Sequence, residues 1–142
     1  MKNYNKKTLI LLINILMLSI GITKSSGQQV PDTSFNFRFS QTAYHPGKGP
    51  VILIDEAHNN YHTKDGGFFA FSKLLEQDGY QVNRLTDAVS GAGVLKNCKI
   101  LVIANPLHTS NTNNWALPTP SAFSKEEINE IEKWVKTGAD CF

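Results

Sequence analysis

The sequence lacks several features that would place it directly in a known class of protein. It has only two cysteines, Cys98 and Cys141, which allow at most one internal disulfide bond and no disulfide framework. It has no Gly-x-Ser-x-Gly elbow, which argues against a hydrolase with an elbow-type nucleophile. It also has no complete phosphate-binding loop, since Gly91-Ala-Gly93 is only a fragment of a dinucleotide fingerprint.

Basic residues are also scarce beyond the amino terminus. Four of the fourteen lysines and arginines are Lys2, Lys6, Lys7 and Lys24, so the rest of the chain carries ten basic and twelve acidic residues. No basic cluster is left that would indicate a nucleic-acid interface. We therefore expect no nucleic-acid partner.

The amino terminus has the three parts of a secretory signal peptide. Three lysines precede an apolar run at residues 9–22, and small residues follow at 25–27. The alternative is an uncleaved membrane anchor, but the apolar run is shorter than the roughly 18 residues that a span requires. We therefore predict a signal peptide at residues 1–27 and a bacterial protein that is secreted or periplasmic and has no membrane span after cleavage.

The rest of the chain alternates predicted strands and helices. Residues 28–49 are polar, with phenylalanines at alternate positions, and form either an extended arm or a half-buried edge strand. Apolar runs predict strands at 51–54, 80–85 and 99–104. Helical spacing predicts helices at 68–75 and after the capping box that Ser124 begins. This order predicts an α/β domain at residues 50–142 with a parallel sheet.

The predicted α/β domain is short at its carboxyl-terminal end. The helix that ends near Val135 should lead to a fourth strand, but only Gly138 to Phe142 follow its stop signal. We therefore expect a domain truncated after the third core strand and the following helix.

Polar side chains gather directly after the first and third strands. In doubly wound sheets, the loops at the carboxyl ends of such strands meet and form the ligand crevice. The candidate catalytic residues are Asp55, Glu56, His58 and His108. The candidate ligand-binding residues are Asn59, Asn60, Asn105 and Trp115. A divalent metal is a further candidate, with Asp55, His58 and His62 as its ligands.

A structural explanation is available for each of these residues. An aspartate at the end of a strand often accepts hydrogen bonds from loop amides, and consecutive asparagines often complete turns. The spacing of His58 and His62 suits a metal site on a helix, whereas here it falls in a predicted loop. The clustering of these residues, more than any one of them, indicates a site.

Three segments resemble an uncharacterised family of exported bacterial proteins, a domain of unknown function within the class I glutamine amidotransferase-like superfamily. The segments are residues 51–62 (VILIDEAHNNYH), residues 100–106 (ILVIANP) and residues 123–135. The resemblance implies a flavodoxin-like three-layer α/β sandwich with this chain as its amino-terminal part. Family members continue as Trp-Val-x-x-Gly-Gly and a strand that ends in Asp-His, whereas this chain departs after Gly138.

The resemblance does not supply an activity. The nucleophilic cysteine of true amidotransferases follows the strand that this chain lacks, so that role does not pass to Cys141. Three hypotheses stay open from the sequence. The chain is a hydrolase-like domain with a polar or metal-assisted site, a non-catalytic module that binds a small molecule, glycan or envelope ligand, or an inactive truncated fragment.

Overall fold

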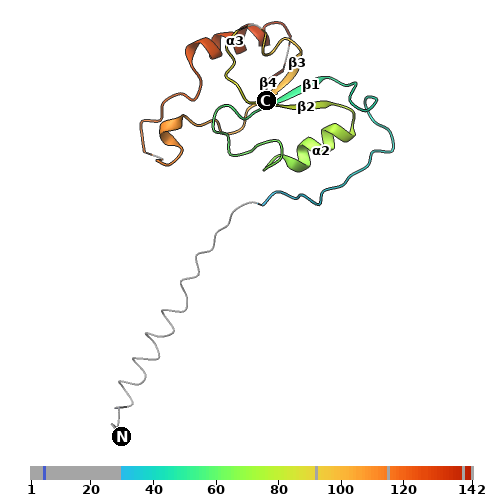
Figure 1. Ribbon diagram of the computed structural model, residues 1–142, viewed down its shortest axis with the longest axis horizontal. Helices are drawn as coiled ribbons and strands as arrows, with labels where there is room; N and C mark the ends of the chain where they lie inside the picture. Colours follow the sequence, from blue (N-terminus) through green and yellow to red (C-terminus); the bar gives the residue numbers. More distant parts are fainter. Residues whose placement is uncertain (1–4, 6–29, 92, 115, 139, 142) are drawn as a thin grey trace.

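The computed structural model describes residues 5, 30–91, 93–114, 116–138 and 140–141. These residues form an α/β fold whose sheet lies between helices (Figure 1). The strands are β1 (Val51–Asp55), β2 (Gln81–Leu85), β3 (Cys98–Val102) and the two-residue β4 (Asp140–Cys141). The helices are α2 (Phe69–Gln77), α3 (Lys125–Val135) and the short 3-10 helix η1 (Thr109–Asn111).

The sheet is parallel throughout and has the order β2-β1-β3-β4. The central strand β1 pairs with β2 from Val51 to Asp55 and with β3 on its other side. Because successive strand side chains point to opposite faces, the apolar run of β1 supplies both layers of the core. The predicted flavodoxin-like α/β fold with a parallel sheet is confirmed for the described residues.

The two longer helices cover opposite faces of the sheet (Figure 1). On the α2 face, Phe68 and Leu75 pack against a buried cluster of strand residues, namely Ile52, Ile54, Val82 and Val102. On the α3 face, Ile131 and Trp134 pack against a second buried cluster, namely Leu85, Val89, Leu95, Cys98 and Leu101. Each helix therefore packs part of its apolar stripe on the sheet, whereas Phe71 on α2 and Ile128 and Val135 on α3 stay exposed.

Residues 30–49 form an extended arm, and no strand is assigned within them. The arm is held at its end by three hydrogen bonds, from Tyr44 N to Asp78 O, from Ala43 N to Asp78 Oδ1 and from Gly49 N to Gly79 O. Gly79 has φ +97°, and a Cβ there would collide with the Tyr44 carbonyl oxygen. A glycine is therefore needed where the arm passes the end of α2.

Several predictions concern residues at the limits of the structure. The predicted signal peptide lies outside the described residues apart from Asn5, and so does Trp115. Among the described residues, none of the helices has the length and apolar character needed to span a membrane. Cys141 pairs with Leu101, three residues along β3 from Cys98.

Candidate functional site

Asp55 ends β1 and is almost completely buried, with 1% of its surface exposed. Its carboxylate accepts a hydrogen bond of 3.1 Å from Ala57 N and one of 2.6 Å from Asn60 Nδ2. It also lies 2.9 Å and 3.0 Å, through its two oxygens, from His58 Nδ1. These contacts close the first turn after the strand and hold two side chains and one backbone N–H around one carboxylate.

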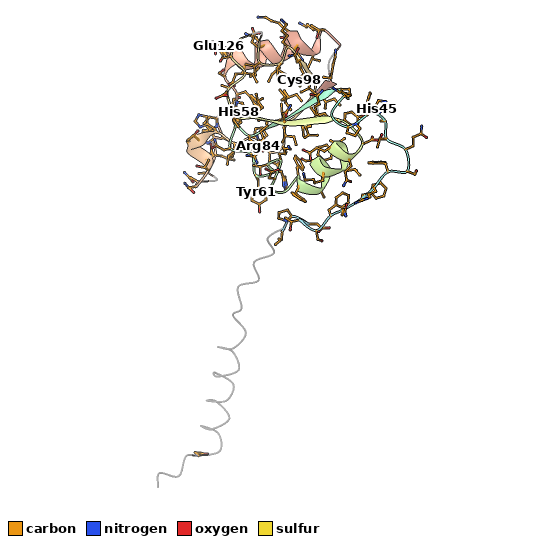
Figure 2. All side chains as sticks on the ribbon, turned by 45° about the vertical axis from the view of Figure 1, so that its right-hand side comes forward. His45, His58, Tyr61, Arg84, Cys98 and Glu126 are labelled. Carbon is orange, nitrogen blue, oxygen red and sulfur yellow. The ribbon has the colours of Figure 1, made fainter. Side chains whose placement is uncertain are left out.

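His58 lies between two carboxylates. Its Nδ1 faces Asp55, and its Nε2 lies 3.0 Å from Glu127 Oε1 on α3. Because an ionised carboxylate only accepts hydrogen bonds, the imidazole satisfies both partners when both ring nitrogens carry a hydrogen. The Phe123 ring covers the imidazole at a centroid distance of 3.9 Å. Figure 2 shows His58 beside the sheet, below the start of α3, where Glu126 is labelled.

Glu127 joins the His58 imidazole to the start of α3 and to a third segment of the chain. Its Oε2 accepts from Ser124 N at 2.9 Å, and Ser124 Oγ accepts from Glu127 N at 3.2 Å, so the predicted capping box is confirmed. Its Oε1 also accepts from Val89 N at 3.0 Å. Asp55, His58 and Glu127 thus form a buried clamp that ties the loop after β1 to α3 and to the loop after β2.

Outside the clamp, the loops after β1 and β3 meet and line an open groove of about 790 Å³. Leu107 N donates to His58 O at 2.8 Å, and Asn59 Nδ2 donates to Leu107 O at 2.9 Å, so the two loops are joined directly. The groove is lined by neutral side chains, namely Asn59, Asn60, Tyr61, Asn105, Pro106, Leu107 and Thr112. Three of the four predicted ligand-binding residues are therefore brought to one groove.

The backbone on both sides of the groove has an uncommon conformation. Asn59 has φ +50° and Asn105 has φ +54°, values that few residues other than glycine adopt. Asparagine tolerates this region better than most side chains, but each such residue still costs on the order of 1 kcal/mol. Both strained positions lie in the groove and at the ends of the two strands where an α/β sheet places its ligands.

Hydrogen-bonding capacity is left over in the groove. Asn60 Nδ2 is bound to Asp55, whereas Asn60 Oδ1 is buried and has no hydrogen-bond partner in the part of the chain that the structure describes. The Asn105 amide likewise makes no side-chain hydrogen bond with the described residues. Of these two amides, only that of Asn105 is exposed and can meet a ligand, whereas the Asn60 oxygen is buried.

The other predicted site residues lie outside the groove. Glu56 accepts a hydrogen bond of 2.7 Å from Lys64 N and lies 3.8 Å from Arg84 Nε, so it anchors the loop at 56–67. His108 caps η1, where its Nδ1 accepts from Ser110 N at 3.2 Å. The predicted convergence of the two loops is thus observed. The His58 side chain faces Asp55 and Glu127, however, whereas the His108 side chain contacts Ser110.

His62, the third predicted metal ligand, packs among rings. Its imidazole stacks on Phe68 and meets Tyr61 edge to face, each at 5.1 Å between centroids. Among the described residues, no three His, Cys, Asp or Glu side chains are grouped closely enough to hold a metal ion. A metal at His58 would have to displace one of the two carboxylates that its nitrogens contact. The metal site stays a hypothesis.

Comparison with known proteins adds no family assignment. No family model, curated protein or solved structure matches this chain. The resemblance to the amidotransferase-like superfamily therefore stays a prediction, and the site is interpreted from its geometry alone.

Two features of the site were not predicted from the sequence. The capping box that Ser124 begins predicts that Glu127 lies in the first turn of α3. It does not predict the contact of Glu127 with His58, because these residues are 69 positions apart. The burial of Glu127 at the sheet edge depends on how α3 docks, which a local pattern does not report. Tyr61, Pro106, Leu107 and Thr112 complete the groove. Tyr61 and Pro106 directly follow the predicted Asn60 and Asn105, which was the available signal, whereas the position of Thr112 gave none.

The Glu127 carboxyl predicts a specific sensitivity to acid. Burial raises its pKa, but hydrogen bonds from Ser124, His58 and Val89 outweigh burial and hold the pKa below its ordinary value of 4.5. A lowered pKa stabilises the folded state above the pKa of the unfolded carboxyl, and this stabilisation is lost as the pH falls through the folded pKa. In thermal melts from about pH 6 to pH 3, the Tm of the wild type should therefore fall more steeply than that of Glu127→Gln.

A matched control for this experiment is Glu126→Gln, one residue earlier on an exposed part of the same helix. Its Tm should follow the pH dependence of the wild type. If the Glu127→Gln and Glu126→Gln curves run parallel, the clamp does not hold Glu127 ionised in solution.

Proposed function

We propose that this protein binds a neutral, hydroxyl-bearing ligand of the carbohydrate type in the groove between the loops after β1 and β3. The observation that carries the proposal is the lining of the groove, where the exposed amides of Asn59 and Asn105 lie with the exposed Tyr61 ring. Side-chain amides bind hydroxyl groups well because each amide offers both a donor and an acceptor.

The composition of the groove supports an uncharged ligand. None of its lining residues is an acid, a lysine, an arginine or a histidine. A charged ligand would lose its hydration in such a groove and gain no opposite charge in return. Tyr61, whose surface is 58% exposed, adds an aromatic ring of the kind on which sugar rings pack.

Binding is favoured over acid–base catalysis because the ionisable candidates are engaged elsewhere. Asp55 and His58 are 1% and 6% exposed, and both ring nitrogens of His58 face carboxylates. A catalytic base needs a lone pair within reach of the substrate. The clamp instead positions the loop that carries Asn59, Asn60 and Tyr61. We also propose export to the cell envelope or beyond, which the amino-terminal pattern supports and where glycan ligands occur.

The test is a binding screen of the full chain against neutral and anionic glycans, followed by calorimetry on the ligands that bind. We expect neutral glycans to bind. Asn105→Gly, in which glycine accepts the φ of +54°, should weaken that binding by about 3- to 10-fold, the effect of losing one neutral hydrogen bond of roughly 0.5–1.5 kcal/mol.

The matched control is Asn97→Ala, because Asn97 is exposed and directly precedes β3, at the other end of that strand from Asn105. It should bind like the wild type. A preference for anionic glycans, or equal affinities of Asn105→Gly and Asn97→Ala, would contradict the proposal.

A further inference from the structure

A second groove lies on the face of the sheet that α2 covers. We call it the α2 groove. It has a volume of about 330 Å³ and is lined by Ile52, Phe71, Leu75, Ile100 and Val102, all of them apolar. Ile52 and Val102 are buried at its floor, whereas Phe71, Leu75 and Ile100 keep part of their surface open to solvent. The α2 groove therefore presents reachable apolar surface and no polar side chain.

The α2 groove exists because α2 covers only part of its face of the sheet. The strand β1 lies between β2 and β3, and Ile100 and Val102 belong to β3. Among the described residues, α2 is the only α-helix on this face, whereas α3 lies on the other (Figure 1). Contiguous apolar surface that a chain leaves uncovered marks a place where a further apolar partner packs.

Phe71 places an exposed aromatic ring at the α2 groove. Its side chain is 41% exposed, and the Phe68 ring lies beside it at a centroid distance of 5.6 Å. Aromatic side chains bury a large apolar area when they are covered, and they are enriched at protein interfaces. One surface thus offers both an apolar hollow and an apolar side chain of the kind that such a hollow accepts.

The charged side chains of α2 lie away from the α2 groove. Phe71 and Leu75 are four residues apart and share one side of the helix, whereas Lys73 and Glu76 lie on the opposite side. Glu76 also forms ion pairs with Lys73 at 2.9 Å and with Lys64 at 2.7 Å. Two copies of the α2 groove can therefore approach each other without the cost of bringing like charges together.

We propose that two copies of this chain associate through the α2 groove, with Phe71 of each copy packed in the groove of the other. A two-fold pair uses the same patch on both copies, so one surface supplies the hollow and the side chain at once. Interfaces between identical subunits are also more apolar than most others, which fits a lining without polar side chains. The association is independent of glycan binding, because the two grooves share no lining residue.

Sedimentation velocity on the full chain, from about 1 to 100 μM, measures the association. We expect the fraction of dimer to rise with concentration. Phe71→Asp should raise the dissociation constant at least about tenfold, because it would bury a charge in an apolar interface. Phe71→Ala should raise it less, since it removes the ring and adds no charge. Far-ultraviolet circular dichroism should show that both variants stay folded.

The matched control is Phe37→Asp. Phe37 is 46% exposed, much like Phe71, but it lies on the extended arm and does not line the α2 groove. The variant should sediment like the wild type. Equal effects of Phe37→Asp and Phe71→Asp would show that any exposed phenylalanine supports the association, which would overturn the assignment to the α2 groove.

Photocrosslinking identifies what occupies the α2 groove. With p-benzoylphenylalanine in place of Phe71, irradiation should join two chains, and mass spectrometry should place the cross-link on α2 or β3 of the second copy. The same amino acid in place of Phe37 should give little of this product.

Three results would overturn the proposal. The first is a chain that stays monomeric at the highest concentration. The second is an association that Phe71→Asp leaves unchanged, as expected if the apolar run at residues 9–22 drives it. The third is a cross-link from position 71 to that run, or to a small apolar molecule, instead of to the α2 face of a second copy.

Discussion

Replacing Glu127 with alanine should lower the free energy of unfolding by about 3–5 kcal/mol, because each buried group left without a hydrogen-bond partner costs roughly 1–3 kcal/mol and a helix cap contributes about 1 kcal/mol. The substitution leaves the buried His58 imidazole without its Nε2 partner and leaves Val89 N without an acceptor. It also removes one half of the capping box of α3. Since small domains have only about 5–15 kcal/mol of stability in total, a large drop in Tm should follow.

Urea denaturation followed by circular dichroism measures this effect. The matched control is Glu126→Ala, an exposed glutamate in the same helical turn, which should change the free energy of unfolding by no more than about 0.5 kcal/mol. Glu127→Gln should fall between the two, since its amide oxygen can accept from only some of the donors. If Glu127→Ala and Glu126→Ala are equally stable, the contact between α3 and His58 is not formed in solution.

Replacing Asp55 with alanine should cost about 3–5 kcal/mol, because each buried group left without a hydrogen-bond partner costs roughly 1–3 kcal/mol, and should also weaken ligand binding. Asp55 is the partner of three groups, namely Ala57 N, His58 Nδ1 and Asn60 Nδ2. Without the carboxylate, His58 loses one of its two partners, and Asn60 loses the acceptor that holds it in the loop beside the groove. Stability and affinity should therefore fall together.

The control for this prediction is Asp65→Ala. Asp65 forms an ion pair with Arg84, but its side chain is 57% exposed, and exposed pairs contribute about 1 kcal/mol or less. Glycan affinity should be unchanged in that variant. Because Asp55 and Glu127 share His58, the double variant should lose less stability than the two single losses together. Strict additivity would show that the clamp does not act as one unit.

The helices and strands were predictable because a local sequence pattern indicates each of them. The apolar run at 51–54 and the acid that ends it mark β1, and the structure extends the strand by one residue to Asp55. The capping box at Ser124 places the start of α3. The differences are at element ends, where β3 stops at Val102, before the predicted Ala104. Strand ends depend on pairing with neighbours, which a single segment does not encode.

The location of the candidate site was also predictable, although its organisation was not. The order of strands and helices places the loops after β1 and β3 together, which brought Asn59, Asn60 and Asn105 to one groove as expected. His58 was proposed as a catalytic or metal-binding residue on the strength of its position. The structure instead turns it inward, between Asp55 and Glu127.

The sequence by itself determined the parallel α/β architecture, the start of α3 and the sheet edge at which polar residues gather, because periodicity and capping act over a few residues. Only the tertiary structure decided which polar residues line the groove and which ones form the buried contacts that hold its loops in place. That choice depends on the docking of α3, which brings Glu127 to a histidine 69 positions away and leaves Asn60 Oδ1 without a partner among the described residues.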